Sequence, residues 1–587
     1  MRISYGPDSV VDSNPHASNA EPAIAADRSA AATLVAAAES GTFSSPPQAF
    51  VSHDGGYDWS VAPLLLGNNG SMLGDVQLAT DPDGTIYFAA LGHQGSKEGI
   101  QFFASANHGD WFRHVSFTAN GRGHGFDHEQ LTIDTSRDPY RGRIYMSALY
   151  ALQLQPQLNA CGLLWSSDGG RLFHGPVQVI DGWCFNSRPV VLSDGTVIFP
   201  FIMGSKVGAS GLPPETRTQK VEVAISKNGG RTFAMPHVIG TYVWPGMANY
   251  KRRMAAGETD FDGDPIPQFT AGISPVTHRD VMYGVWSDMR TENSRLLFTK
   301  STDEGRHWST PRAILTTANP RDAQYQVSLA VNDRGVLGVA YLQYLNASRD
   351  ITEMFADSTD SGATFSKPVP IQSTPAALSL PGAAGYTAFA YREEKSKLKE
   401  HLLVEFTDPT QRFPSGGDYV QMVADRNGTF HPIWADARTG TSQVWTASVT
   451  VGAGTNVPAN LSAADVSGDV DVQFGARTWD KARHLLSVPV RLHNVGTRPL
   501  YPPFTVTVLR VDTPLLPPSW NPRVKPSLVN ADNGRRGVGA VYTYGPRMLG
   551  NLGVLAPGAE TAARTWKIVV SGQNPAIVLR IDGYESP

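Results

Sequence analysis

The chain has 587 residues and a formal net charge of −4, with 41% hydrophobic residues, 17% charged residues, 57 glycines and 42 prolines. This profile is typical of a turn-rich, all-β globular protein and argues against a mainly helical or a disordered chain. The chain has no basic patch and no run of about 18 apolar residues, so we expect neither a nucleic-acid partner nor membrane insertion.

An eight-residue pattern, Ser-x-Asp/Asn-x-Gly-x-x-Trp/Phe, first occurs at residues 52–59. It recurs five times, beginning at Ser105, Ser166, Ser226, Ser301 and Ser358. The Asp or Asn side chain can bond back to backbone N–H groups, and the glycine can adopt angles that other residues avoid. We expect the aromatic ring to anchor the hairpin against its own sheet. Six copies cannot all meet at one site, so we interpret the pattern as a folding device and name it the turn staple.

The segments between the staples also repeat, which is typical of a repeat architecture. Seven of them contain two short β-prone runs separated by a turn: 21–41, 75–93, 128–150, 187–203, 270–290, 326–344 and 419–438. Short runs punctuated by Asp-Gly and Asn-Gly predict strands. Seven four-stranded units predict a seven-bladed β-propeller, with a six-bladed ring as the alternative. The seventh unit lacks a staple, so we expect residues 2–12 to supply the strand that closes the last blade.

The sequence pattern changes near residue 452, where a stretch of small residues begins and after which the staple does not recur. We predict a propeller over residues 1–451, a small-residue linker over 452–464 and a β-sandwich accessory domain over 465–587.

The two cysteines, Cys161 and Cys184, are either a disulfide or two buried thiols. The start of the chain has no apolar signal core. We nevertheless expect an extracellular or periplasmic protein whose signal peptide is not part of this sequence.

The six staples resemble the Asp-box, or BNR, repeats of the sialidase-like propeller superfamily, and the likeness covers residues 1–451. It implies staples on one face and a functional funnel on the other. Sialidases hold a substrate carboxylate with three arginines, the first in an Arg-Ile-Pro stretch. Here Ala20, Glu21 and Pro22 stand at that place, so the arginine is absent. The resemblance offers Arg188 as a later substrate-binding arginine and Tyr419 as the counterpart of the nucleophilic tyrosine.

The richest candidate for catalysis is the segment GRGHGFDHEQL, which contains His124, Asp127, His128 and Glu129. Carboxylates and histidines this close can provide general acid/base chemistry. Asp75 opens the preceding unit and is the candidate second carboxylate, since glycoside hydrolysis needs two. The structural alternative is that Asp127 caps a strand and His128 packs between blades.

Two units end in similar segments, GVWSDMR and PIWADAR, which contain Arg290 and Arg438. Each arginine either pairs with the preceding Asp288 or Asp436 to hold a loop, or lines the funnel and binds an acidic sugar. Tyr325 starts another unit and is expected to face the funnel.

The segment GETDFDGDPIPQ places Asp260, Asp262 and Asp264 at alternate positions. They are weak candidates for Ca²⁺, because the glycine and glutamate of a calcium loop are missing; a solvated acidic loop is the alternative. No other cofactor is expected.

Two functions remain open. The first is a secreted, sialidase-like glycoside hydrolase acting on an acidic or complex glycan. The second is a non-catalytic propeller that binds a glycan or a protein.

Overall fold

We analysed a computed structural model of the chain. It describes residues 2–585 except 6–7, 13, 15–17, 31, 41–44, 57, 67–69, 120–124, 152–158, 181–183, 204–217, 244–265, 289, 292, 346, 348–349, 373–375, 378–385, 390–402, 407–418, 437, 439–441, 453–460, 513–526, 546–547, 550–553 and 570–575. The described residues contain strands β1 to β44 and no α-helix, which confirms the all-β prediction. Within them, no helix is long and apolar enough to span a membrane.

The chain divides into two compact units. One comprises Asn14–Pro370 and Pro375–Thr446, and the other comprises Met1–Ser13, Ile371–Thr374 and Ala447–Pro587.

The larger unit is built from antiparallel sheets that follow one another along the chain. The first two are β3 (Asn19–Ala26), β4 (Leu34–Ser40), β5 (Gln48–Ser52) and β6 (Ser60–Ala62), then β8 (Gly70–Thr80), β9 (Ile86–Gln94), β10 (Lys97–Ser105) and β11 (Phe112–Ala119), with β7 (Leu64–Leu65) parallel to β11. The next two are β12 (Phe126–Ile133), β13 (Ile144–Ala151), β14 (Asn159–Ser166) and β15 (His174–Ile180), then β16 (Cys184–Asn186), β17 (Val190–Val191), β18 (Val197–Met203), β19 (Thr218–Ser226) and β20 (His237–Val243).

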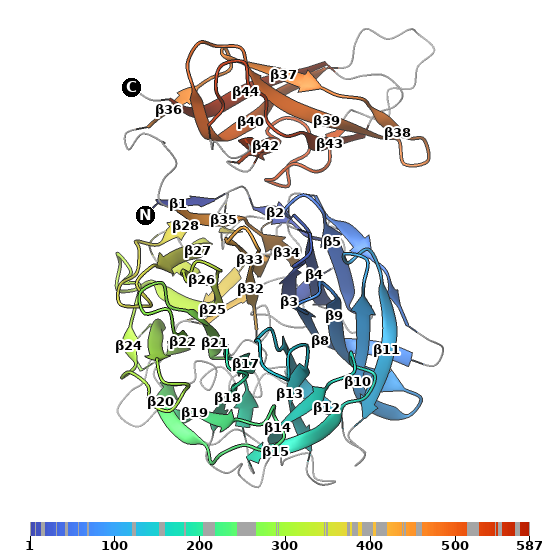
Figure 1. The fold of residues 1–587 in the computed structure, drawn as a ribbon. Helices are drawn as coiled ribbons and strands as arrows, with labels where there is room; N and C mark the ends of the chain where they lie inside the picture. Colours follow the sequence, from blue (N-terminus) through green and yellow to red (C-terminus); the bar gives the residue numbers. More distant parts are fainter. Residues whose placement is uncertain are drawn as a thin grey trace. The chain divides into compact units, whose positions relative to one another are not determined.

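The later sheets repeat the same order. They are β21 (Gln268–Ile273), β22 (Asp280–Asp288), β23 (Arg295–Ser301) and β24 (Arg312–Ala313), then β25 (Ala323–Val331), β26 (Leu337–Leu345), β27 (Asp350–Ser358), β28 (Val369–Pro370) and β29 (Ala376–Ala377), and lastly β32 (Gln421–Ala424), β33 (Thr429–Asp436) and β34 (Gln443–Thr446). A separate hairpin pairs β30 (Tyr386–Phe389) with β31 (Leu403–Phe406). Figure 1 shows the sheets around a common centre, with β3, β8, β12, β17, β21, β25 and β32 innermost, which is the arrangement of a β-propeller.

The hydrophobic core of this unit lies between neighbouring sheets. Val35 and Val51 of the first sheet share a buried cluster with Ile86 and Phe88 of the second, and the same pairing continues along the chain. Between β14 and β16, Cys161 and Cys184 form a disulfide with a Cα–Cα distance of 6.0 Å, which decides the alternative that the sequence left open.

All six staples form the same hydrogen-bonded turn. In each, the glycine N–H donates to the serine Oγ over 2.8–3.0 Å. The glycine has a φ between 75° and 96°, where a side chain is strained. At Gly170 a Cβ atom would lie 2.1 Å from the Phe102 ring of the preceding sheet. The staple is therefore a folding device. Because its glycine has no side chain, the turn can also pack closely against the neighbouring sheet.

The expected position of the aromatic ring is wrong for two staples. Phe173 packs edge-on against Phe102, and Phe365 against Phe298, with ring centroids 5.0 and 5.2 Å apart; both partners belong to the preceding sheet. Trp308 packs on Phe269 of its own sheet, as expected. The glycine permits the close approach that makes the ring contact across the sheets.

The smaller unit contains two antiparallel sheets and an N-terminal pair. The pair joins β1 (Arg2–Tyr5) to β35 (Val449–Gly452), and β2 (Ser9–Val10) follows β1. One sheet has β36 (Ser462–Asp465), β44 (Ala576–Glu585), β40 (Leu500–Asp512) and β42 (Val541–Tyr544), and the other has β37 (Val470–Phe474), β38 (Thr478–Asp480), β39 (Leu485–Asn494), β43 (Arg564–Val569) and β41 (Ser527–Leu528). Buried side chains of both sheets, among them Val506 of β40 and Trp566 of β43, form one hydrophobic cluster.

Candidate functional site

Four innermost strands carry a bulge at the same place. The ladder register shifts within β3, β8, β12 and β25, and Glu21, Asp75, His128 and Gln326 there have φ values of 47–51°. A residue other than glycine is strained in this region, and bulges commonly redirect a side chain beside a functional site. The bulges thus turn polar side chains of successive sheets toward one another.

Acidic side chains of the first three sheets meet at these bulges. The Asp75 N–H donates to Glu39 Oε2 (2.7 Å), and the His128 N–H donates to Asp75 Oδ2 (2.8 Å). Ligand atoms of Glu21, Glu39 and Asp75 lie within 4.8 Å of one another, as do those of Asp75, Asp127 and His128. We call Glu21, Glu39, Asp75, Asp127, His128 and Glu129 the acidic cluster.

The members of the acidic cluster differ in exposure. The Asp127 side chain is 57% exposed, whereas Glu129 is completely buried and Asp75 nearly so. A substrate in solution can therefore reach Asp127 first.

Glu129 occupies a position that is apolar in two other sheets, where Val76 and Val327 are buried after the same bulge. Neither of its carboxyl oxygens has a hydrogen-bond partner among the described residues. Burial, and then the nearby charge of Asp75, raise the pKa of Glu129 well above its usual value. Burial thus favours the protonated form of the Glu129 carboxyl group.

Tyr419, just before β32, is buried near the cluster. Burial raises the pKa of its phenol well above the usual value, and the charges of Glu21 and Asp75 add to the effect. Its hydroxyl has no partner in the part of the chain that the structure describes. The structure thus brings Tyr419 into the neighbourhood of Asp75 and Glu129, as the sequence predicts.

The acidic cluster and the staples lie at opposite ends of the strands. Thr80 at the end of β8 pairs with Ile86, which pairs with Ser105 at the start of a staple. Asp75 is five residues earlier in β8, or about 17 Å at a rise of 3.3 Å per residue. The next sheet repeats this register, because Ile133 and Ser166 both pair with Ile144 while Asp127 pairs with Leu149.

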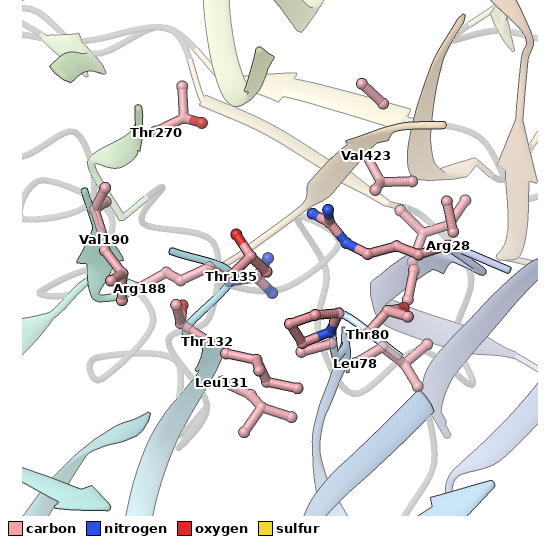
Figure 2. Close-up of a pocket in the computed structure, with 18 of the residues that line it drawn as sticks. Arg28, Leu78, Thr80, Leu131, Thr132, Thr135, Arg188, Val190, Thr270 and Val423 are labelled. Carbon is pink, nitrogen blue, oxygen red and sulfur yellow. The ribbon is translucent and has the colours of Figure 1, made fainter. Parts of the chain in front are cut away.

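Arg188 does not join the acidic cluster in the described structure. Its Nη2 donates to Gln77 Oε1 (3.0 Å), and Gln421 Nε2 donates to the same oxygen (2.8 Å). Gln77 follows Asp75 by two residues in the direction of the staples. We call these three side chains the glutamine layer. Of the three, Arg188 also lines a central cavity, and Figure 2 shows its side chain there.

The other predicted binding residues lie elsewhere. Arg290 pairs with Asp288 (Nε–Oδ1 2.6 Å) and also donates to the Thr241 carbonyl. Arg438 pairs with Asp436 (2.7 Å), and its guanidinium lies 4.0 Å from the ring centroid of Trp445. Both arginines therefore hold their own loops, which was the structural alternative.

The Tyr325 side chain is half-buried with an enclosed hydroxyl, and this desolvation, followed by the charges of Tyr344 and Glu353, raises its pKa well above the usual value. Both neighbours belong to its own sheet. The weak calcium candidates Asp260, Asp262 and Asp264, and also His124, lie outside the described residues.

Sequence reasoning did not assign Glu21 or Glu39 to the site. Glu21 was noticed only because it stands beside an absent arginine, and Glu39 lies in an alanine-rich strand with no motif around it. The signal that could have found both is burial: an acid that directly follows an alanine in an alanine-rich strand that is buried throughout. Carboxylate oxygens at this spacing suit a hard cation such as Ca²⁺, with Glu21, Glu39 and Asp75 as ligands.

No family model matches the chain, and no curated protein matches it. Solved structures similar to it include an α-L-arabinofuranosidase of Fusarium graminearum (15% identity, 57% of this chain and 92% of that one, TM-score 0.39). They also include a sialidase, Hadza microbial sialidase Hz136 (12% identity, covering 70% of this chain and 75% of that one, TM-score 0.36). A third is the BP39L lectin of Burkholderia pseudomallei (12% identity, covering 73% of this chain and 98% of that one, TM-score 0.38). A sialidase is thus among the similar structures, as the resemblance of the staples implies. With TM-scores below 0.5, these similarities do not indicate a reaction or a ligand.

Proposed function

We propose that this protein is a sialidase-like glycoside hydrolase that acts on an acidic or complex glycan at the acidic cluster. The observation that carries the proposal is the pair Asp75 and Asp127, whose carboxyl oxygens lie within 4.8 Å beside the buried Glu129, whose pKa is raised. Pairs of carboxyl groups held in different environments are what glycoside hydrolysis requires.

The spacing favours a retaining mechanism, in which the two carboxyl groups are about 5–5.5 Å apart, over an inverting one at about 6.5–9.5 Å. Asp127, the exposed group, would give a proton to the glycosidic oxygen as the bond to the anomeric carbon breaks. Asp75 would attack that carbon to form a glycosyl ester. Water, losing its proton to Asp127, would then release the sugar and free Asp75. Glu129 would act as a positioning residue, with His128 and Tyr419 at the edge of the site.

The test is a glycan-library hydrolysis screen with the full chain. The variants Asp127→Asn and Asp75→Asn are then assayed on the substrate that the wild type cleaves. Each variant should lower kcat by about 10²–10⁴-fold, the range for acid/base catalysis. Asp110→Asn, an exposed aspartate beside a staple, is the matched control and should leave kcat unchanged. Full activity in both cluster variants would exclude the proposed site.

The alternative function is a non-catalytic propeller that binds a glycan or a protein. Two observations favour it: Glu21 stands beside the place of the first sialidase arginine, and Glu129 is too deeply buried to touch a ligand directly. A protein that cleaves nothing but binds a glycan array, with binding lost in Asp127→Asn, would establish this alternative.

The same proposal includes a seven-bladed Asp-box propeller over residues 1–451, closed by the N-terminal strand, and a C-terminal β-sandwich over 465–587. The Cys161–Cys184 disulfide supports an extracellular or periplasmic protein, because disulfides persist in oxidising compartments. The expected partner is a glycan, and Ca²⁺ at the acidic cluster is a proposal that equilibrium dialysis can test.

A further inference from the structure

The centre of the propeller contains a cavity on the staple side of the glutamine layer. Its volume is about 510 Å³, within the range of about 300–1,000 Å³ that is usual for small-molecule sites. Its walls are the second halves of the innermost strands, among them residues 78–80 of β8, 131–133 of β12 and 269–271 of β21. The cavity is therefore separate from the acidic cluster at the other end of these strands.

A positive charge at the inner end of this cavity has no acidic partner among the described residues. The only side-chain bond of Arg188 there is the one to Gln77, a neutral amide. Burial lowers the pKa of Arg188 to about 10, and no carboxylate offsets the effect. The Arg188 side chain is half-buried, and an arginine with this pKa is still charged at neutral pH. A partly buried charge is stabilised when an opposite charge is supplied.

Two of the three acids that line the cavity are already engaged, and the third, Asp333, is exposed. Asp27 accepts hydrogen bonds from Ser29 and lies 2.8 Å from His108 Nδ1, while Asp425 accepts the backbone N–H groups of Asn427 and Thr429. They hold turns at the mouth and do not neutralise Arg188.

A second arginine and several threonines line the same space. Arg28, at the end of β3, is exposed at the mouth and has no ion pair in the described structure. Thr80 Oγ1 is buried without a partner among the described residues. Figure 2 shows Arg188 and Arg28 reaching into the cavity from different walls, with Thr80, Thr132 and Thr270 around it.

We infer that the central cavity binds a small organic oxyanion, whose carboxylate or phosphate group pairs with Arg188 while Arg28 closes the mouth. A guanidinium presents several N–H donors in a plane that matches either group. The volume of the cavity suits a body of about monosaccharide size, and its wall contains several threonines. This site goes beyond the proposed hydrolase function and does not depend on it.

The test is isothermal titration calorimetry of the full chain with sodium glucuronate and, separately, with inorganic phosphate at low ionic strength. At least one probe should bind saturably with one site per chain. Arg188→Met should weaken that binding at least tenfold and Arg28→Met severalfold. Two controls should bind like the wild type: Arg171→Met, an exposed arginine on a staple outside the cavity, and Asp127→Asn in the acidic cluster.

Glucuronate binding alone would identify a carboxylate ligand, and phosphate binding alone a phosphate ligand. The inference is overturned if neither probe binds at 10 mM, a concentration about tenfold above a millimolar Kd, or if both arginine variants bind like the wild type. Should Arg188→Met fail to fold, the exposed Arg28→Met variant decides. Binding that depends on Asp127 and on neither arginine would place the ligand in the acidic cluster, which refutes this inference and leaves the proposed function standing.

Discussion

Replacing Asp303 with alanine should destabilise the propeller, and the staple of β23 allows the magnitude to be estimated. Asp303 Oδ1 accepts hydrogen bonds from Ser301 Oγ and from the His307 N–H, each over 2.9 Å, and Oδ2 lies 2.6 Å from His307 Nδ1. A net value of about 0.5–1.5 kcal/mol per hydrogen bond sets an upper range of roughly 1.5–4.5 kcal/mol. The Asp303 side chain is 36% exposed, so water replaces part of what is lost. We therefore expect a loss of about 1–3 kcal/mol.

Differential scanning calorimetry and urea denaturation at pH 7 measure this loss. With an unfolding entropy of about 2.1 cal/mol/K per residue, the loss lowers Tm by roughly 1–3 °C in a propeller of this size. Asp303→Asn is the matched control, since two of the six staples carry asparagine at this position and asparagine keeps one acceptor oxygen. Its cost should be under about 1 kcal/mol. Binding or activity per folded molecule should be unchanged in both variants.

The effect should also depend on pH. Burial raises the pKa of Asp303, but the hydrogen bonds from His307 and Ser301 outweigh it and lower that pKa below the usual value. A carboxylate whose pKa is depressed in the folded state stabilises the protein above its unfolded pKa, about 3.9, and this stabilisation is lost as the pH falls through the folded pKa. The difference between wild type and Asp303→Ala should therefore shrink in acid. Equal melting of the two proteins at pH 7, or an Asn variant as unstable as the Ala variant, would refute the reasoning.

Three further outcomes are expected. Because the pKa of Glu129 is raised in the folded state, wild-type stability should fall as the pH rises above about 4.3, and Glu129→Gln should gain stability relative to wild type over that rise; parallel melting curves would argue against a raised pKa of Glu129. Reducing the Cys161–Cys184 disulfide, whose cysteines are 23 residues apart, should cost about 3 kcal/mol in urea denaturation, and a Cys184→Ser variant should no longer respond to reductant. Deleting residues 2–12 should lower Tm steeply if they close the last blade, and a deletion that melts like the parent would disprove that closure.

Local patterns in the sequence were enough to predict the all-β class and the staples. A staple is complete within eight residues, since Ser301, Asp303 and Gly305 bond mainly to one another and to His307. The alternation of short apolar runs with Asp-Gly turns likewise depends on neighbours in the chain. These features could be predicted because the hydrogen bonds that define them close over a few residues.

The tertiary structure decided which distant side chains meet. Gln77 bonds to Arg188 and Gln421, which lie 111 and 344 residues away, and Asp75 meets Glu39 of the preceding sheet. Arg188 was expected in the funnel with the acids, yet it lies in the glutamine layer at the end of the central cavity. Such contacts depend on how the sheets close into a ring and on where each innermost strand bulges. A shift of one residue reverses the side of the strand on which a side chain lies, so spacing along the chain cannot predict them.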